Sequence, residues 1–105
     1  MPTIATVVYP YETKFDMSYY LQTHMPLVYE KWSQYGLTKW QVVEIKKTLG
    51  DAQPLYSVQA LLEFNEADGL AEAVKSDAGV AVFDDVKNFS DKSPVFLAGS
   101  VVGSS

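Results

Sequence analysis

His24 is the chain's only histidine, and histidine is the side chain best suited to proton transfer near neutral pH. It lies two positions before Pro26, among several tyrosines. An imidazole in such a place can give or take a proton, or hold an enol or phenol oxygen by a hydrogen bond. The phenols of Tyr19, Tyr20 and Tyr29 are close enough in sequence to act beside it. We therefore predict a site around His24, with this residue as general acid or base.

An amphipathic helix is expected to carry His24 on its inward side. Asp16 is the predicted N-cap, and Gly36 is predicted to follow the last turn in a left-handed conformation. Pro26 has no N–H for the carbonyl of Gln22 and its ring crowds that carbonyl, so the helix should bend or loosen beside His24. The inward stripe, at steps of three and four residues, consists of Met17, Tyr20, Leu21, His24, Val28, Trp32 and Tyr35.

A bend at this point predicts a gap between helix and sheet that is apolar with a few polar tips, which is typical of a small-molecule pocket. Tyr20 is the predicted catalytic partner of His24, and Tyr20 or Tyr29 would orient the substrate. An alternative is a packed core histidine bonded to a backbone carbonyl or a tyrosine, among aromatic residues that serve packing alone. The predicted substrate contacts are Tyr19, Pro26, Val28, Tyr29 and Trp32.

Several kinds of site have no support in the sequence. Without cysteine there is no disulfide, thiolate metal site or cysteine nucleophile. No nucleotide, zinc or calcium motif occurs, and the carboxylates of EFNEADGLAE and DAGVAVFDD are expected to form a solvated face and not a metal site. We expect no metal and no tightly bound cofactor, although haem with His24 as axial ligand stays open as an alternative.

Composition narrows the partners and the setting. The net charge is −5 and the eight Lys and Arg residues form no basic run, so nucleic acid is not an expected partner. No apolar stretch approaches the roughly 20 residues that span a bilayer, and no basic segment precedes an apolar run at the amino terminus. We expect a soluble, cytoplasmic protein without membrane contact. A length of 105 residues fits one domain over residues 1–105.

The elements that would position the site follow the order βαββαβ. The second helical region is interrupted at SDAG, where Asp77 is a candidate cap for its second part. This order predicts an α+β, ferredoxin-like fold, with a four-stranded antiparallel sheet and both helices on one face. Strands are expected at 3–9, 37–47, 55–65 and 93–102, and helices at 17–35 and 66–89.

The sheet face away from the helices is also expected to be apolar. In the first strand Ile4 and Val8 lie opposite Ala5, Val7 and Tyr9, and in the last strand Val95 and Leu97 lie opposite Phe96 and Ala98, so both faces are apolar. Because monomers seldom expose an apolar patch of this size, a second copy is the expected cover. The sequence therefore predicts a symmetric homodimer that packs sheet against sheet.

Two segments resemble one known family. YYLQTHMPLV, on the first helix, and FDDVKNFSDKSPVFLAG, before and within the last strand, are similar to the EthD family of the dimeric α+β barrel superfamily. The resemblance covers nearly the full chain. It carries over His24, with Tyr20 and Pro26 in the same motif. It implies a dimer whose two sheets form a barrel, with a pocket in each subunit between the sheet and the first helix.

The resemblance also implies a class of function. The family is named for ethyl tert-butyl ether degradation, where its member accompanies a cytochrome P450 oxidation system. A similar protein would be a cofactor-independent enzyme of oxidoreductase, decarboxylase or cyclase type, acting on a hydrophobic or aromatic compound in degradation or secondary metabolism. The alternatives are a ligand-binding or accessory protein of an oxidase system, without catalysis, and a purely structural dimer.

Overall fold

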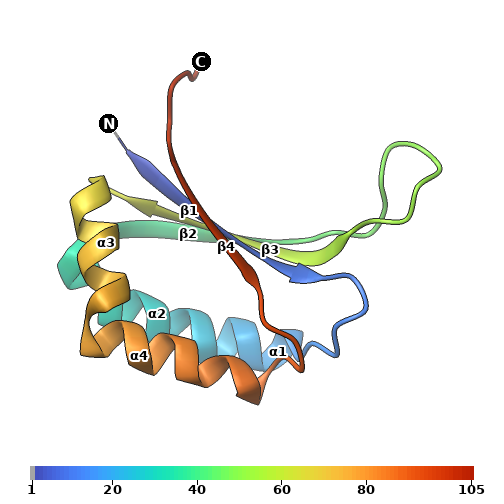
Figure 1. Cartoon of the computed structure of the whole chain (residues 1–105), viewed down its shortest axis with the longest axis horizontal. Coiled ribbons are helices and arrows are strands. Elements are labelled where there is room, and N and C mark those ends of the chain that lie inside the picture. The colour runs from blue at the N-terminus through green and yellow to red at the C-terminus, as the bar shows by residue number, and fades with distance from the viewer. Residues whose placement is uncertain (1) are drawn as a thin grey trace.

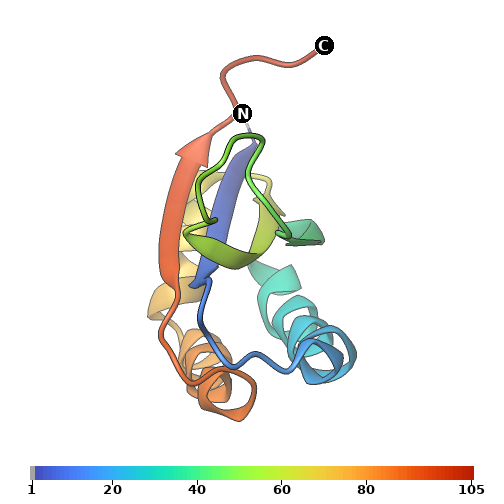
Figure 2. The same ribbon diagram turned by 90° about the vertical axis from the view of Figure 1, so that its right-hand side faces the viewer.

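The computed structural model describes residues 2–105 and contains a four-stranded antiparallel sheet with helices on one face (Figures 1 and 2). The predicted α+β, ferredoxin-like order is confirmed. The spatial strand order is β2-β3-β1-β4. The strands are β1 Thr3–Pro10, β2 Leu37–Glu44, β3 Tyr56–Phe64 and β4 Val95–Ser100, and the helices are α1 Met17–Tyr19, α2 Met25–Trp32, α3 Ala67–Lys75 and α4 Asp77–Asp84.

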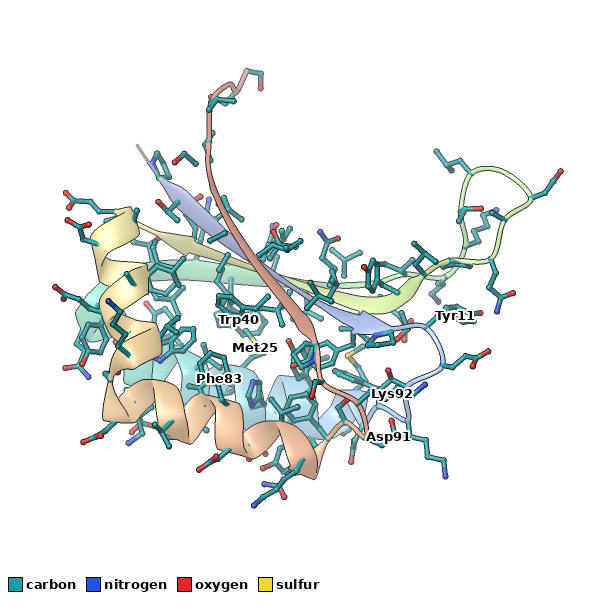
Figure 3. All side chains as sticks on the ribbon, viewed as in Figure 1. Tyr11, Met25, Trp40, Phe83, Asp91 and Lys92 are labelled. Carbon is teal, nitrogen blue, oxygen red and sulfur yellow. The ribbon has the colours of Figure 1, made fainter. Side chains whose placement is uncertain are left out.

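The central strand β1 sets which side chains enter the core. It pairs with β3 on one side and β4 on the other, so that Val7 lies opposite both Ala60 and Phe96. Side chains alternate between the two faces of a strand, and Ala5, Val7 and Tyr9 of β1 are buried toward the helices. The main core therefore lies between the sheet and the helix layer, where Figure 3 shows Met25 and Phe83.

The first helix begins and ends where the sequence predicted. The Asp16 carboxylate accepts the Tyr19 backbone N–H at 3.0 Å, and Gly36 takes a φ of 101° beyond the last turn. The loosening expected near Pro26 takes the form of a π-helical turn over Tyr20–His24, between α1 and α2. In this turn the Met25 N–H reaches the Tyr20 carbonyl, five residues back. A π turn inside an α-helix frequently marks a functional site.

The second helical region has a different cap from the predicted one. Ser76, and not Asp77, is the N-cap of α4, because its hydroxyl accepts the Gly79 N–H at 3.1 Å. Asp77 lies in the first turn, where its charge still meets the positive end of the helix dipole. A 3₁₀ turn over Asp85–Asn88 follows α4 directly. This turn brings Asp85 back toward the first helix.

The outer face of the sheet, away from the helices, carries exposed apolar side chains. Val43 on β2 and Val95 and Leu97 on β4 are all exposed. Strands β2 and β4 are shorter than predicted, and the connection after β2 extends as a long loop beyond the sheet (Figure 1). The apolar outer face that the sequence predicted is thus present.

Candidate active site

A cavity of about 250 Å³ lies between the sheet and the helices. Its wall is mainly apolar, which suits a hydrophobic ligand. An apolar cavity of about 150 Å³ is large enough for benzene, so this one suits a compound of one or two rings and not a haem macrocycle. The lining residues are Val7, Tyr9, Tyr20, His24, Met25, Val28, Trp32, Ala60, Leu62, Val82, Phe83, Val86, Ser93, Pro94 and Phe96.

His24 contributes an oriented imidazole to this wall. Its side chain is only 5% exposed, and Nδ1 lies 2.8 Å from Oδ2 of Asp85. The ring stacks on Tyr20, with centroids 5.2 Å apart and planes at 14°, and it contacts the ring of Phe89 at 4.4 Å. An ionised carboxylate only accepts hydrogen bonds, so Nδ1 carries the proton in the neutral ring. Nε2 is left with a free lone pair.

Asp85 corrects the prediction that the acidic residues of DAGVAVFDD form a solvated face. Its side chain is 11% exposed and accepts three hydrogen bonds. Besides His24, the Tyr19 hydroxyl donates to Oδ1 at 2.6 Å and the Asn88 amide donates to the same atom at 2.9 Å. The carboxylate is thereby fixed behind the imidazole. Asp77 and Asp84, the other acidic residues of this segment, keep the exposed positions that were expected.

The pKa values of the pair follow from burial and from these hydrogen bonds. Burial lowers the pKa of His24 below its ordinary value, and the hydrogen bond and charge of Asp85 oppose the shift without cancelling it. For Asp85, burial acts to raise the pKa, but the hydrogen bonds from Tyr19, Asn88 and His24 outweigh it and hold the pKa below its ordinary value. At neutral pH the pair is therefore a neutral imidazole on an ionised carboxylate.

Two phenols line the cavity next to His24. Tyr20, one turn before His24, is almost fully buried and has its pKa raised mainly by burial, with a hydrogen bond from Tyr9 acting in the opposite direction. Burial and the neighbouring Tyr20 raise the pKa of Tyr9 as well. Both phenols therefore stay protonated and can donate hydrogen bonds. Tyr9 was not predicted as a site residue, although it shares the inward face of β1 with Ala5 and Val7.

The other predicted contacts divide into two groups. Val28 and Trp32 line the cavity. Tyr19 lies outside the lining, where its hydroxyl binds Asp85. Tyr29 is 44% exposed, and Pro26 is exposed as well; neither is among the lining residues. Of the two phenols expected to orient a substrate, Tyr20 therefore lines the cavity and Tyr29 does not.

Asp85, which binds His24, and Tyr9, which lines the cavity, were not predicted as site residues. Asp85 is 61 positions from His24, and no spacing rule connects the two. The only local signal was the segment FDDVKNF, whose resemblance to the family was noticed without a role for either aspartate. For Tyr9, a signal was available in the alternation of β1, which places it with the buried side chains.

Residues 2–105 offer neither a clustered metal site nor a membrane span. Within that range, no group of three His, Asp or Glu side chains is placed to hold a metal ion. In the same range, no helix has both the length and the apolar character needed to cross a membrane. The cytoplasmic location and the lack of a nucleic-acid partner stay predictions.

The fold places the chain in a class, the ferredoxin-like α+β proteins. The match with SnoaB from Streptomyces nogalater, a cofactor-independent oxygenase, has a TM-score of 0.67 and 7% identity over 98% of this chain and 94% of that chain. Neither a family model nor a curated protein matches the sequence.

Within this class the chain is similar to EthD proteins. An EthD-like protein from Ralstonia eutropha is 24% identical, with a TM-score of 0.84 over 97% of this chain and 93% of that chain. An ethyl tert-butyl ether degradation (EthD) family protein from Bacillus halodurans is 21% identical, with a TM-score of 0.74 over 97% of this chain and 100% of that chain. The chain has the EthD-like fold, which supports the resemblance drawn from its motifs.

Proposed function

We propose that this protein is a cofactor-independent enzyme that removes a proton from a hydrophobic or aromatic compound, with His24 as the general base. The observation that carries the proposal is the 2.8 Å contact between His24 Nδ1 and Asp85 in the wall of an apolar cavity. An oxidoreductase, decarboxylase or cyclase acting without a cofactor can each use such a proton transfer. SnoaB, named as a cofactor-independent oxygenase, has a similar fold and so lends support.

The proposed step moves one proton and one electron pair. Nε2 of His24 takes a proton from a carbon beside a carbonyl, and the electron pair of the broken C–H bond forms an enolate. Asp85 stabilises the imidazolium through Nδ1, as the carboxylate does in other histidine-based sites. The Tyr20 phenol donates a hydrogen bond to the oxygen where negative charge develops. His24 then returns the proton to carbon or oxygen as general acid.

Deuterium exchange tests this step with a simple ketone in place of the natural substrate. The probe is 2-tetralone, a neutral two-ring ketone with acidic C–H bonds beside its carbonyl. In D₂O, the wild-type protein should accelerate the loss of those proton NMR signals. His24→Ala should lower the catalysed rate by roughly 100-fold or more, because the base is gone while the cavity is kept.

The adjacent aspartates supply a matched pair of variants. Asp85→Asn should reduce the exchange rate by about tenfold or more, because the orientation and tautomer of His24 are no longer fixed. Asp84→Asn removes the same charge from an exposed position and should leave the rate unchanged.

Three results would contradict the proposal. Full activity in His24→Ala would exclude His24 as the base. Binding of 2-tetralone without exchange in the wild-type protein would favour the accessory, ligand-binding alternative. If His24→Ala changed only the melting temperature, with no effect on a ligand, a structural histidine would be the better account.

The proposal includes a homodimer formed through the outer face of the sheet. Leu97 is 53% exposed on this face, and Val43 and Val95 are exposed on the same face. The helices cover only the opposite face (Figure 2). A second copy packed on this face would remove the apolar surface from water, with the favourable free energy that such burial brings.

A further inference from the structure

Trp32 presents an unpaired hydrogen-bond donor in the cavity wall. The residue has no exposed surface, and its indole Nε1–H has no acceptor among residues 2–105. Its aromatic neighbours are Phe64 and Phe83, each with its ring centroid 6.0 Å from that of the indole. A buried donor without a partner is costly and uncommon. Because the N–H itself has no open surface, a ligand atom in the cavity that Trp32 lines can supply the missing acceptor once a neighbouring side chain moves aside.

The charge of the wall indicates what kind of ligand that is. Of the residues that line the cavity, none is a lysine or arginine, and the nearest fixed charge is the Asp85 carboxylate behind His24. An anionic ligand would lose its hydration on entering the cavity and would find no cation there to pair with, which is unfavourable. The hydrogen-bonding side chains that the wall does offer are neutral: the imidazole of His24, the phenols of Tyr9 and Tyr20, the indole of Trp32 and the hydroxyl of Ser93.

The polar groups also lie at two separate levels along the first helix. His24 and Tyr20 are one turn apart on the first helix, whereas Trp32 is the last residue of α2, eight positions after His24. At about 1.5 Å per residue, that is about 12 Å along the helix axis. One ligand oxygen cannot serve both levels, so a ligand that satisfies both must carry two polar groups.

We infer that the natural ligand is an uncharged compound of one or two rings, with its reacting carbonyl at His24 and Tyr20 and a second acceptor oxygen at the Trp32 indole. A ketone, quinone or ester oxygen would serve as that acceptor. The inference rests on the proposed function and names the substrate class of the same cavity. It assigns Trp32 as a specificity-determining residue, while the chemistry stays with His24.

A matched ligand pair tests the role of Trp32. The pair is 6-acetyl-2-tetralone and 6-isopropyl-2-tetralone, which share the ring ketone and differ in whether the far substituent carries an acceptor oxygen. In the ¹H–¹⁵N NMR spectrum, only Trp32 and Trp40 give indole signals, and Trp40→Phe assigns them. The acetyl compound should move the Trp32 indole proton downfield, and the isopropyl compound should not.

Affinity provides a second readout. The wild-type preference for the acetyl over the isopropyl compound, measured as a ratio of Kd values, should fall by about 3- to 10-fold in Trp32→Phe, the effect of one neutral hydrogen bond. This variant keeps an aromatic ring and loses the N–H. The anion 2-naphthoate should bind more weakly than either ketone.

The possible failures can be told apart. Suppose that the acetyl compound binds but shifts the Trp32 indole signal no more than the isopropyl compound does. In that case the N–H faces the Phe83 ring and not the ligand oxygen, and the inference is wrong. Failure of both ketones to bind, or tighter binding of 2-naphthoate, would also overturn it. A response of the indole without deuterium exchange would uphold the ligand class while contradicting the proposed catalysis.

Discussion

His24 and Asp85 form one hydrogen-bonded pair. The pKa values of both residues are lowered, but by different causes. Burial disfavours the charged imidazole, whereas three donated hydrogen bonds favour the charged carboxylate. The pair is consequently ready to accept a proton at Nε2 and to stabilise it once bound. Residues such as Phe89 and Tyr20, which pack on the ring faces, hold this arrangement away from water.

The lowered pKa of His24 predicts a pH-dependent stability. The unfolded chain binds a proton at its histidine as the pH falls below the ordinary value of 6.5, while the folded protein does not until its lower pKa is reached. The stability that comes from the neutral His24 should therefore be fully present above pH 6.5. It should decrease as the pH falls from 6.5 to the lower pKa that His24 has in the folded protein. The contribution of Asp85, whose lowered pKa lies below 3.8, should be lost only at more acidic pH.

Urea unfolding at about pH 7.5 and about pH 5.5 measures this effect. The free energy of unfolding of the wild-type protein should be smaller at the lower pH. In His24→Gln, which cannot titrate, the difference should shrink. A wild-type protein that is equally stable, or more stable, at the lower pH would show that His24 does not have a lowered pKa.

Of the hydrogen-bonded pair His24 and Asp85, only His24 was predicted from the sequence. His24 was identified because it is a rare residue type on an inward helical stripe, and Val28 and Trp32 followed from the same periodicity. Asp85 could not be found in this way, because its role depends on a tertiary contact and nothing local distinguishes it from Asp84. Tyr29 was predicted near the ligand from sequence proximity, but the rotation of the helix places it on the exposed side.

At the scale of elements, the helix layer depends on close backbone contacts. Gly69 of α3 lies where an added Cβ would overlap the carbonyl oxygen of Tyr35, at the end of the first helix. Only a residue without a Cβ permits this approach. The contact keeps the two helical regions together above the sheet, and the cavity lies within the same layer.

Gly69→Ala should therefore destabilise the fold, by roughly 1–3 kcal/mol as is typical of overpacking, even though alanine favours helices. Gly50→Ala is the control, since a Cβ there meets nothing within 4 Å. Chemical unfolding of both variants gives the comparison. Equal stability of Gly69→Ala and Gly50→Ala would mean that the helices do not pack as closely as the structure shows.

The elements themselves were largely predictable, and their details were not. Alternation in β3 and the stripe of the first helix depend on one face being buried, a signal that the sequence carries directly. The predicted loosening at Pro26 was correct in place, but its π-helical form depends on how the chain packs on both sides. The cap at Ser76 was missed because serine and aspartate are both good N-caps, and the local sequence does not choose between Ser76 and Asp77.

At the scale of the whole molecule, the sheet has one face covered and one face open. The βαββαβ order placed all helices on one side, as the sequence predicted (Figures 1 and 2). The apolar side chains of the other side then require a cover that a single chain does not supply. The homodimer follows from this imbalance and stays a prediction.

Sedimentation analysis of the wild-type protein should show a dimer at micromolar concentration. Leu97→Lys places a charge on the proposed interface and should produce monomers, because the unpaired charge would have to be buried. Val80→Lys, at a residue 56% exposed on α4, is the matched control in the helix layer and should stay dimeric. A monomeric wild-type protein, or a dimeric Leu97→Lys, would exclude the sheet-to-sheet interface.

The most direct test of the central claim is the ¹⁵N NMR spectrum of the His24 ring at about pH 7, with and without 2-tetralone. Because the chain has one histidine, both ring nitrogen signals belong to His24, and their couplings to the two carbon-bound ring protons distinguish Nδ1 from Nε2. We predict a neutral ring with the proton on Nδ1, facing Asp85, and an unprotonated Nε2 whose signal moves when the ketone binds. A proton on Nε2, or a charged ring at this pH, would contradict the account.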